Sequence, residues 1–124
     1  MTRWIPKLLR LDAYGPEDRL HLRPLLIECL GEGDYDGLFA AATPAFVVPW
    51  AARRRGYAAH AALHGRAIVG LCVDPDLRRL GLGSLVLNAC LVELGLTGGE
   101  AQVVLAPGSD GRAFLASNGF KHRT

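Results

Sequence analysis

Arginine and glycine residues lie close together in the segment Arg78-Arg79-Leu80-Gly81-Leu82-Gly83-Ser84. A glycine has no Cβ atom, so an anionic group can approach the backbone N–H groups beside Gly81 and Gly83. The first N–H groups of a helix lack partners inside the helix and lie at the positive end of its dipole, which favours bound anions. Guanidinium groups add formal positive charge and hydrogen bonds to phosphate oxygens. The segment therefore predicts a phosphate-binding site at the start of a helix.

The glycine spacing excludes two common phosphate loops. A Walker loop needs Gly-Lys followed by Ser or Thr, and the chain contains no such sequence. A dinucleotide-binding fingerprint needs a third glycine three residues after Gly83, where Val86 stands. The pattern is instead Val73-x-Pro75 followed by Arg78-x-x-Gly81-x-Gly83.

This pattern resembles the pyrophosphate loop of the GCN5-related N-acetyltransferase (GNAT) family, which follows the fourth strand of that family's sheet. A second segment, Ala113-Phe114-Leu115-Ala116-Ser117-Asn118-Gly119-Phe120, is similar to the helix ending near the family's C-terminus. The distance between the two motifs suits one helix and one strand, as in the family. Together the motifs cover roughly residues 67 to 120.

The resemblance implies that the chain uses acetyl-CoA or coenzyme A as cosubstrate or ligand, without a metal. The pyrophosphate would lie on the backbone N–H groups, and the pantetheine arm would pair with the main chain of the preceding strand. The implied activity is N-acetyl transfer to a primary amine, by direct attack in a ternary complex. The expected cofactor-binding residues are Leu71, Cys72, Val73, Arg78, Arg79, Leu80, Gly81, Leu82, Gly83 and Ser84.

The chain departs from the family pattern where the general acid is expected. The family has a tyrosine four residues before the last glycine, and Leu115 stands there. Leucine cannot protonate a leaving thiolate. Ser117 and, on a predicted strand, His60 are weak catalytic candidates, because a serine has an unsuitable pKa and a lone strand histidine is more often structural. The sequence therefore assigns neither an acid nor a base.

A regulatory function is the alternative. Leu9-Arg10-Leu11-Asp12-Ala13-Tyr14 and Asp18-Arg19-Leu20-His21-Leu22 are similar to the start of small GNAT-fold factors that promote self-cleavage of the aspartate 1-decarboxylase zymogen. Such a factor binds coenzyme A and the zymogen, and it needs little catalysis. The partner would then be the zymogen, whereas an acetyltransferase would take a small-molecule or protein amine.

The elements that would position the loop alternate between strands and helices. Strands are expected at 6–11, 57–63, 67–73 and 101–106, the last two as buried strands. Helices are expected from Gly15-Pro16 to Leu30, at 38–42, from about Gly83 to Leu94 and at 112–117. Pro24 predicts a kink in the first helix or a later start for it. The prolines after Thr43 predict an irregular segment up to Trp50.

This alternation predicts an α/β (α+β) class with a mixed sheet, and the resemblance implies a centrally splayed GNAT sheet flanked by helices. The 124 residues are expected to form a single domain, 1–124. In the family two more strands follow the Gly-Phe pair, whereas four residues follow Phe120 here, so the C-terminal end is expected to be short. The strand at 101–106 would then expose an edge, which predicts a homodimer or a partner that adds a strand.

Composition excludes several other classes. Half of the residues are hydrophobic, 21% are charged and the net charge is +2, which is the balance of a folded globular domain. No apolar run reaches the roughly 20 residues of a membrane span, and no signal peptide is recognisable, so a cytoplasmic location is expected. Cys29, Cys72 and Cys90 lack zinc-ligand spacing and are expected to be buried reduced thiols. The arginine run 53–55 has no aromatic interleaving, which argues against nucleic-acid binding.

Overall fold

The computed structural model describes residues 6–50, 56–78, 80–95 and 102–104. Within these ranges the strands form a five-stranded sheet in the order β1-β2-β3-β4-β5, antiparallel except for the parallel β4–β5 pair. The strands are β1 (Leu9–Leu11), β2 (Ala45–Trp50), β3 (Gly56–His64), β4 (Ala67–Val73) and β5 (Gln102–Val103). The predicted mixed sheet is therefore confirmed.

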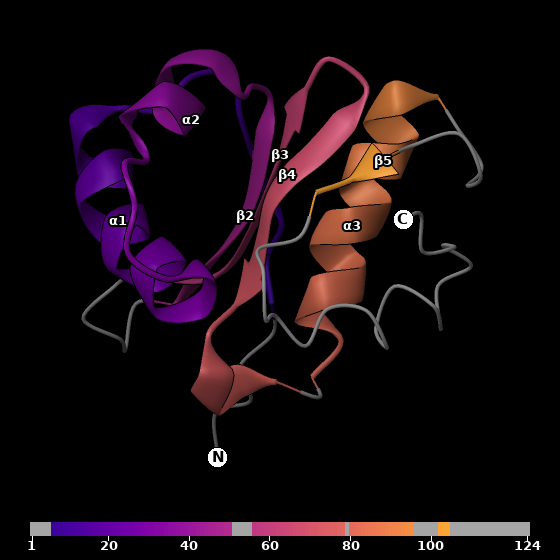
Figure 1. The fold of residues 1–124 in the computed structure, drawn as a ribbon. Helices are drawn as coiled ribbons and strands as arrows, with labels where there is room; N and C mark the ends of the chain where they lie inside the picture. Colours follow the sequence, from indigo (N-terminus) through magenta and orange to yellow (C-terminus); the bar gives the residue numbers. More distant parts are fainter. Residues whose placement is uncertain (1–5, 51–55, 79, 96–101, 105–124) are drawn as a thin grey trace.

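Helices cover both faces of this sheet. They are α1 (Pro16–Leu30), α2 (Asp36–Ala41) and α3 (Leu82–Leu94), with a short 3-10 turn, η1 (Pro75–Leu77), before α3. Figure 1 shows α1 and α2 on one face and α3 on the other. The α1-side core includes Leu22, Leu25, Leu26, Phe39 and Cys72, and the α3-side core includes Ile68, Leu82, Val86, Leu87 and Cys90. None of the described helices is long and apolar enough to cross a bilayer.

Helix α1 runs through Pro24 without a break. Its start follows the prediction, since Pro16 occupies the first turn and the Asp18 carboxylate accepts a hydrogen bond from the Gly15 N–H at 2.8 Å. The later start that Pro24 suggested is wrong. Pro24 is exposed and Leu20, four residues earlier, is 68% exposed, so the carbonyl that loses its helical partner lies on the solvent side. The three-to-four spacing of leucines in this helix predicts one apolar face that includes Leu20, but Leu20 does not belong to the buried face.

The segment expected to be irregular before Trp50 is strand β2, which pairs with both β1 and β3. Pro44 lies just before the strand, where it interrupts no ladder. Pro49 lies at a shift of register against β3, where a proline costs no regular hydrogen bond. Burial of Phe46, Val47 and Val48 between the layers therefore outweighs the local proline signals.

The described part of β5 differs from the predicted buried strand at 101–106. Gln102 is exposed, Val103 is half-buried and Val104 is 58% exposed. Its parallel pairing is confirmed at two positions, Ala67 with Gln102 and Ile68 with Val103. The remaining residues of that prediction, and the expected helix at 112–117, lie outside the described ranges.

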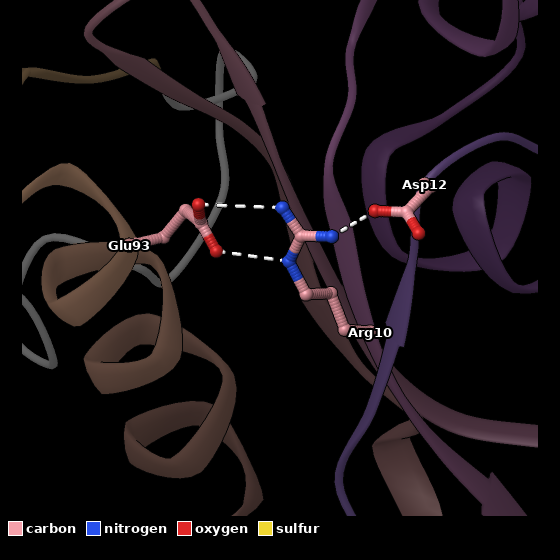
Figure 2. Close-up of polar contacts among 3 residues, drawn as sticks. All are labelled: Arg10, Asp12 and Glu93. Carbon is pink, nitrogen blue, oxygen red and sulfur yellow. Dashed lines mark hydrogen bonds and ion pairs between the residues drawn. The ribbon is translucent and has the colours of Figure 1, made fainter.

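A charged contact joins the first strand to the last described helix (Figure 2). Arg10 of β1 donates from Nε to Oε1 of Glu93 at 2.9 Å and from Nη2 to Oε2 at 3.3 Å, and Nη1 contacts Asp12. The hydrogen bond from Arg10 lowers the pKa of Glu93. The contact connects β1, at one edge of the sheet, to the helix that carries the predicted phosphate loop.

Candidate functional site

Asp74 fixes the connection between β4 and α3. Its side chain is fully buried, and its Oδ1 accepts a hydrogen bond from the Asp76 N–H at 3.0 Å. Its own N–H donates to the Ala58 carbonyl of β3 at 2.8 Å, and its carbonyl accepts from the Leu77 N–H at 2.9 Å. These bonds hold η1 in a fixed position. The sequence identified Asp74 only as the end of a strand, so this positioning role was missed, although Asp-Pro before a turn is the signal for it.

Gly81 is the residue from which α3 begins. Its φ of +78° lies in the left-handed region, which favours glycine, and its carbonyl accepts the first helical hydrogen bond from the Leu85 N–H at 3.1 Å. A Cβ on Gly81 would point into open space, and glycine has no side chain that could cap the helix. The N–H groups of Leu82, Gly83 and Ser84, the first turn of the helix, therefore receive no cap from Gly81.

The structure brings most of the predicted loop residues to one place. Arg78, Leu80 and Gly81 are exposed, whereas Gly83 and Ser84 are half-buried. Leu82 is an exception, because its side chain is only 1% exposed and anchors the helix start in the α3-side core. Arg79 lies outside the described residues. Backbone N–H donors, a helix dipole and the Arg78 guanidinium form a donor set that fits a pyrophosphate.

A bulge at Gly70 sets the direction of the end of β4. His60 pairs with Cys72 and Ala62 pairs with Val69, so Gly70 and Leu71 together lie opposite Ala61. Gly70 has a φ of +63°, a conformation that favours glycine. Strict alternation would put Ile68 and Cys72 on the same face, but the extra residue places them in opposite cores.

Beyond this bulge, β4 has an edge that no described strand covers. The described pairing with β5 ends at Ile68, whose carbonyl accepts from the Val104 N–H at 2.9 Å. The Asp74 N–H points at β3, and in a trans peptide the preceding carbonyl points the opposite way. The Val73 carbonyl therefore points away from β3, toward that edge. The residues expected to pair with pantetheine, 71–73, thus lie next to the loop.

His60 is held in the interior rather than presented to this edge. It is fully buried in the α1-side layer, its Nδ1 lies 2.8 Å from the Gly70 carbonyl and its Nε2 lies 2.8 Å from the Tyr14 hydroxyl. A carbonyl only accepts, so Nδ1 carries the proton and Nε2 accepts from Tyr14. Burial lowers the pKa of His60 to about 4. This geometry gives the weak catalytic candidate His60 a structural role.

Ser117, the other weak catalytic candidate, lies outside the described residues, as do Leu115 and the rest of the C-terminal motif. Among the acidic residues after α1, Asp36 accepts a hydrogen bond from Arg23 at 2.6 Å, which lowers its pKa, and Asp34 accepts one from the Asp36 N–H at 3.0 Å. These exposed carboxylates serve local structure.

Comparison with solved structures identifies the architecture. A GNAT-family acetyltransferase from Streptococcus pneumoniae matches with a TM-score of 0.69 at 15% identity, over 94% of this chain and 88% of that one. An acetyltransferase from Trypanosoma brucei gives 0.62 at 17%, over 97% and 95%. The YhhK protein of E. coli, solved with coenzyme A bound, gives 0.61 at 20%, over 98% and 94%. The chain has the GNAT fold.

At these identities the likeness establishes the GNAT fold and confirms the predicted α/β architecture. No protein-family model matches the chain, nor does any curated protein sequence. Within the GNAT fold, the Arg78-to-Ser84 loop joins β4 to the helix that follows it, where the motif predicted such a loop. The sequence thus located the loop correctly through its glycines and the strand before it.

The structure also shows a contact of the Cys29 thiol that the sequence did not predict. Cys29, near the end of α1, is only half-buried, and its Sγ donates to the Val73 carbonyl at 3.2 Å. The expectation of three buried thiols therefore holds for Cys72 and Cys90 but not for Cys29. Nothing in the sequence signals this contact, because 44 positions separate the two residues.

Proposed function

We propose that this protein is an acetyl-CoA-dependent N-acetyltransferase that acetylates a primary amine. The observation that carries the proposal is the start of α3 in a GNAT fold, where Gly81 leaves the first helical N–H groups without a side-chain cap directly after β4. The coenzyme A bound to the YhhK protein of the same fold supports the choice of anion.

The chain's own groups would divide the binding of acetyl-CoA between two places. The N–H groups of Leu82 to Ser84 and the Arg78 guanidinium would hold the pyrophosphate. The main chain of residues 71–73, at the edge of β4 that no strand in the described ranges covers, would hold the pantetheine arm as an added strand does. The thioester would then lie against the bulge at Gly70, which orients that edge.

The proposed reaction is a direct transfer. The amine nitrogen attacks the thioester carbonyl carbon, a C–N bond forms, the C–S bond breaks and the coenzyme A thiolate leaves. The attacking nitrogen loses its extra proton to water and the thiolate takes its proton from water, because His60 is committed to Gly70 and Tyr14 and leucine replaces the expected acid at position 115. The proposed enzyme is therefore slow.

A thermal-shift experiment tests binding. Coenzyme A at a hundred times its Kd should stabilise the protein by about 2.7 kcal/mol. Gly83→Val should abolish this shift, because a β-branched side chain blocks the approach of phosphate to the loop. Gly37→Val is the matched control, since Gly37 is also the second residue of a helix and lies far from the loop in the sequence. Absence of a shift with any coenzyme A species in the unmutated protein would refute the proposal.

A turnover experiment tests transfer. Acetyl-CoA is incubated with a panel of amino acids, polyamines, aminoglycosides and peptides, and free thiol release is followed. Release that depends on one amine and is lost in Gly83→Val supports the transferase. Binding without amine-dependent release across the panel favours the second function.

The second function is a coenzyme A-dependent regulator, such as an activator of aspartate 1-decarboxylase zymogen cleavage. The sequestered His60 favours it, together with the N-terminal resemblance around Leu9–Tyr14, because a regulator needs no base. Co-purification of the zymogen with the protein, strengthened by coenzyme A, would support this function. Zymogen cleavage that is unchanged by the protein would refute it.

A further inference from the structure

The Cys29 thiol lies at the edge of β4 that no described strand covers. Its Sγ donates to the Val73 carbonyl, and that carbonyl points away from β3, as the opposite direction of the Asp74 N–H requires. Cys29 is also half-buried, whereas Cys72 and Cys90 are buried. Cys29 is thus the most exposed of the three cysteines.

A second thiol lies beside it. Cys72 belongs to the α1-side core, against which Cys29 packs, and the Cys29 Sγ lies against the carbonyl of Val73, the residue next to Cys72. The bulge at Gly70 causes this arrangement, because without the extra residue Cys72 would lie on the α3 side of the sheet. Two thiols 43 positions apart in sequence therefore form an adjacent pair, which we call the dithiol.

The surroundings make the two thiols unequal. The Cys72 thiol lowers the pKa of Cys29, and Arg78 lowers it further, while burial and Asp74 oppose the shift. The Cys29 thiol and burial raise the pKa of Cys72. Ionised Cys29 no longer donates to Val73, so its sulfur becomes free to react. Thiolate is the nucleophilic form of cysteine, so Cys29 attacks first and Cys72 second.

We propose that the dithiol is a modification site for low-molecular-weight disulfides, with Cys29 as the attacking thiol and Cys72 as the resolving thiol. The Cys29 sulfur attacks one sulfur of a disulfide R–S–S–R, forms a mixed disulfide and releases one R–S⁻. The Cys72 sulfur then attacks the Cys29 sulfur, closes the Cys29–Cys72 disulfide and releases the second R–S⁻. The dithiol is oxidised by two electrons, and R–S–S–R is reduced to two thiols.

The preferred reagent is coenzyme A disulfide, a choice that rests on the proposed function. Arg78 contributes both to the electrostatics of Cys29 and to the predicted pyrophosphate loop, so its positive charge attracts an anionic disulfide toward the thiol. Glutathione disulfide has the same reactive bond without the pyrophosphate. Comparing the oxidation rates with the two disulfides therefore distinguishes the reactivity of the dithiol from binding of the reagent by the loop.

The test uses the full-length reduced protein, with intact mass and non-reducing peptide mapping after incubation with each disulfide. We expect loss of two hydrogen atoms and a peptide that links Cys29 to Cys72. Cys72→Ser should stop at a stable mixed disulfide on Cys29, and Cys29→Ser should stay unmodified. Cys90→Ala is the matched control and should react like the unmutated protein, because Cys90 is fully buried in the other core and burial raises its pKa to about 12.

The results separate the two proposals. The dithiol proposal would be overturned if all three thiols stay free after excess glutathione disulfide. It would also be overturned if Cys29→Ser is oxidised as much as the unmutated protein. Either conclusion holds even if coenzyme A still shifts the melting temperature. Oxidation by both disulfides at equal rates would support the dithiol while contradicting delivery by the loop. Alkylation of the unmutated protein with iodoacetamide tests the proposal without relying on variants that could misfold. Cys29 should be labelled at least tenfold faster than Cys90, and equal labelling would overturn the proposal.

Discussion

Replacing Gly70 with alanine tests whether the bulge in β4 depends on glycine. An added Cβ would lie 3.0 Å from Cε1 of His60, 3.1 Å from Cδ1 of Leu38 and 3.2 Å from Nδ1 of His60. His60 cannot move away easily, because hydrogen bonds to Tyr14 and Gly70 hold both ring nitrogens. The φ of +63° adds backbone strain for any residue with a side chain.

The expected cost has two parts. Left-handed backbone costs alanine about 1–2 kcal/mol. Crowding in a packed core typically adds about 1–3 kcal/mol. The free energy of unfolding should therefore fall by about 2–5 kcal/mol. Gly65→Ala is the matched control, since Gly65 has a φ of +62° but no atom within 4 Å of an added Cβ, so only the backbone part applies.

Urea unfolding followed by circular dichroism measures both variants. Gly70→Ala should lower the midpoint by more than Gly65→Ala at an unchanged m-value. A coenzyme A titration should show weaker binding for Gly70→Ala alone, because the bulge orients the edge at 71–73. Equal destabilisation by the two substitutions would refute the crowding argument, and unchanged coenzyme A affinity in Gly70→Ala would refute the role of the bulge at the site.

Three further predictions concern pH, catalysis and assembly. His60 binds a proton below about pH 6.5 in the unfolded chain but only near pH 4 in the native protein. The free energy of unfolding should therefore fall by up to about 3 kcal/mol as the pH drops from 6.5 to 4. Urea titrations should show a smaller fall for His60→Gln. Leu115→Tyr should raise amine acetylation, by up to the roughly 100- to 10,000-fold that general acid–base catalysis supplies; an unmutated enzyme already near ten turnovers per second would contradict this. The exposed Val104 beside β5 favours edge pairing, so sedimentation should show a dimer at tens of micromolar, and a strict monomer there would count against it.

Features that depend on neighbouring residues could be predicted from the amino-acid sequence. Pro16 with Asp18 sets the start of α1, the apolar run 67–73 sets β4, and Gly81 sets the start of α3. In each case the signal lies within seven consecutive residues or fewer, so the residue types alone carry it. The spacing of glycines and arginines in the loop is likewise a feature of neighbouring residues. This is why the predicted strand and helix on either side of that segment agree with the structure, whereas phosphate binding stays a prediction.

The places where distant parts of the chain meet could not be predicted, because they depend on the folded chain. The prolines around β2 predicted an irregular segment, but pairing with two strands and burial of Phe46 to Val48 made it a strand. The bulge at Gly70 needed the register against β3, which no local pattern encodes. That register sequestered His60 and brought Cys72 beside Cys29, because one extra residue in a strand exchanges the faces of every side chain beyond it.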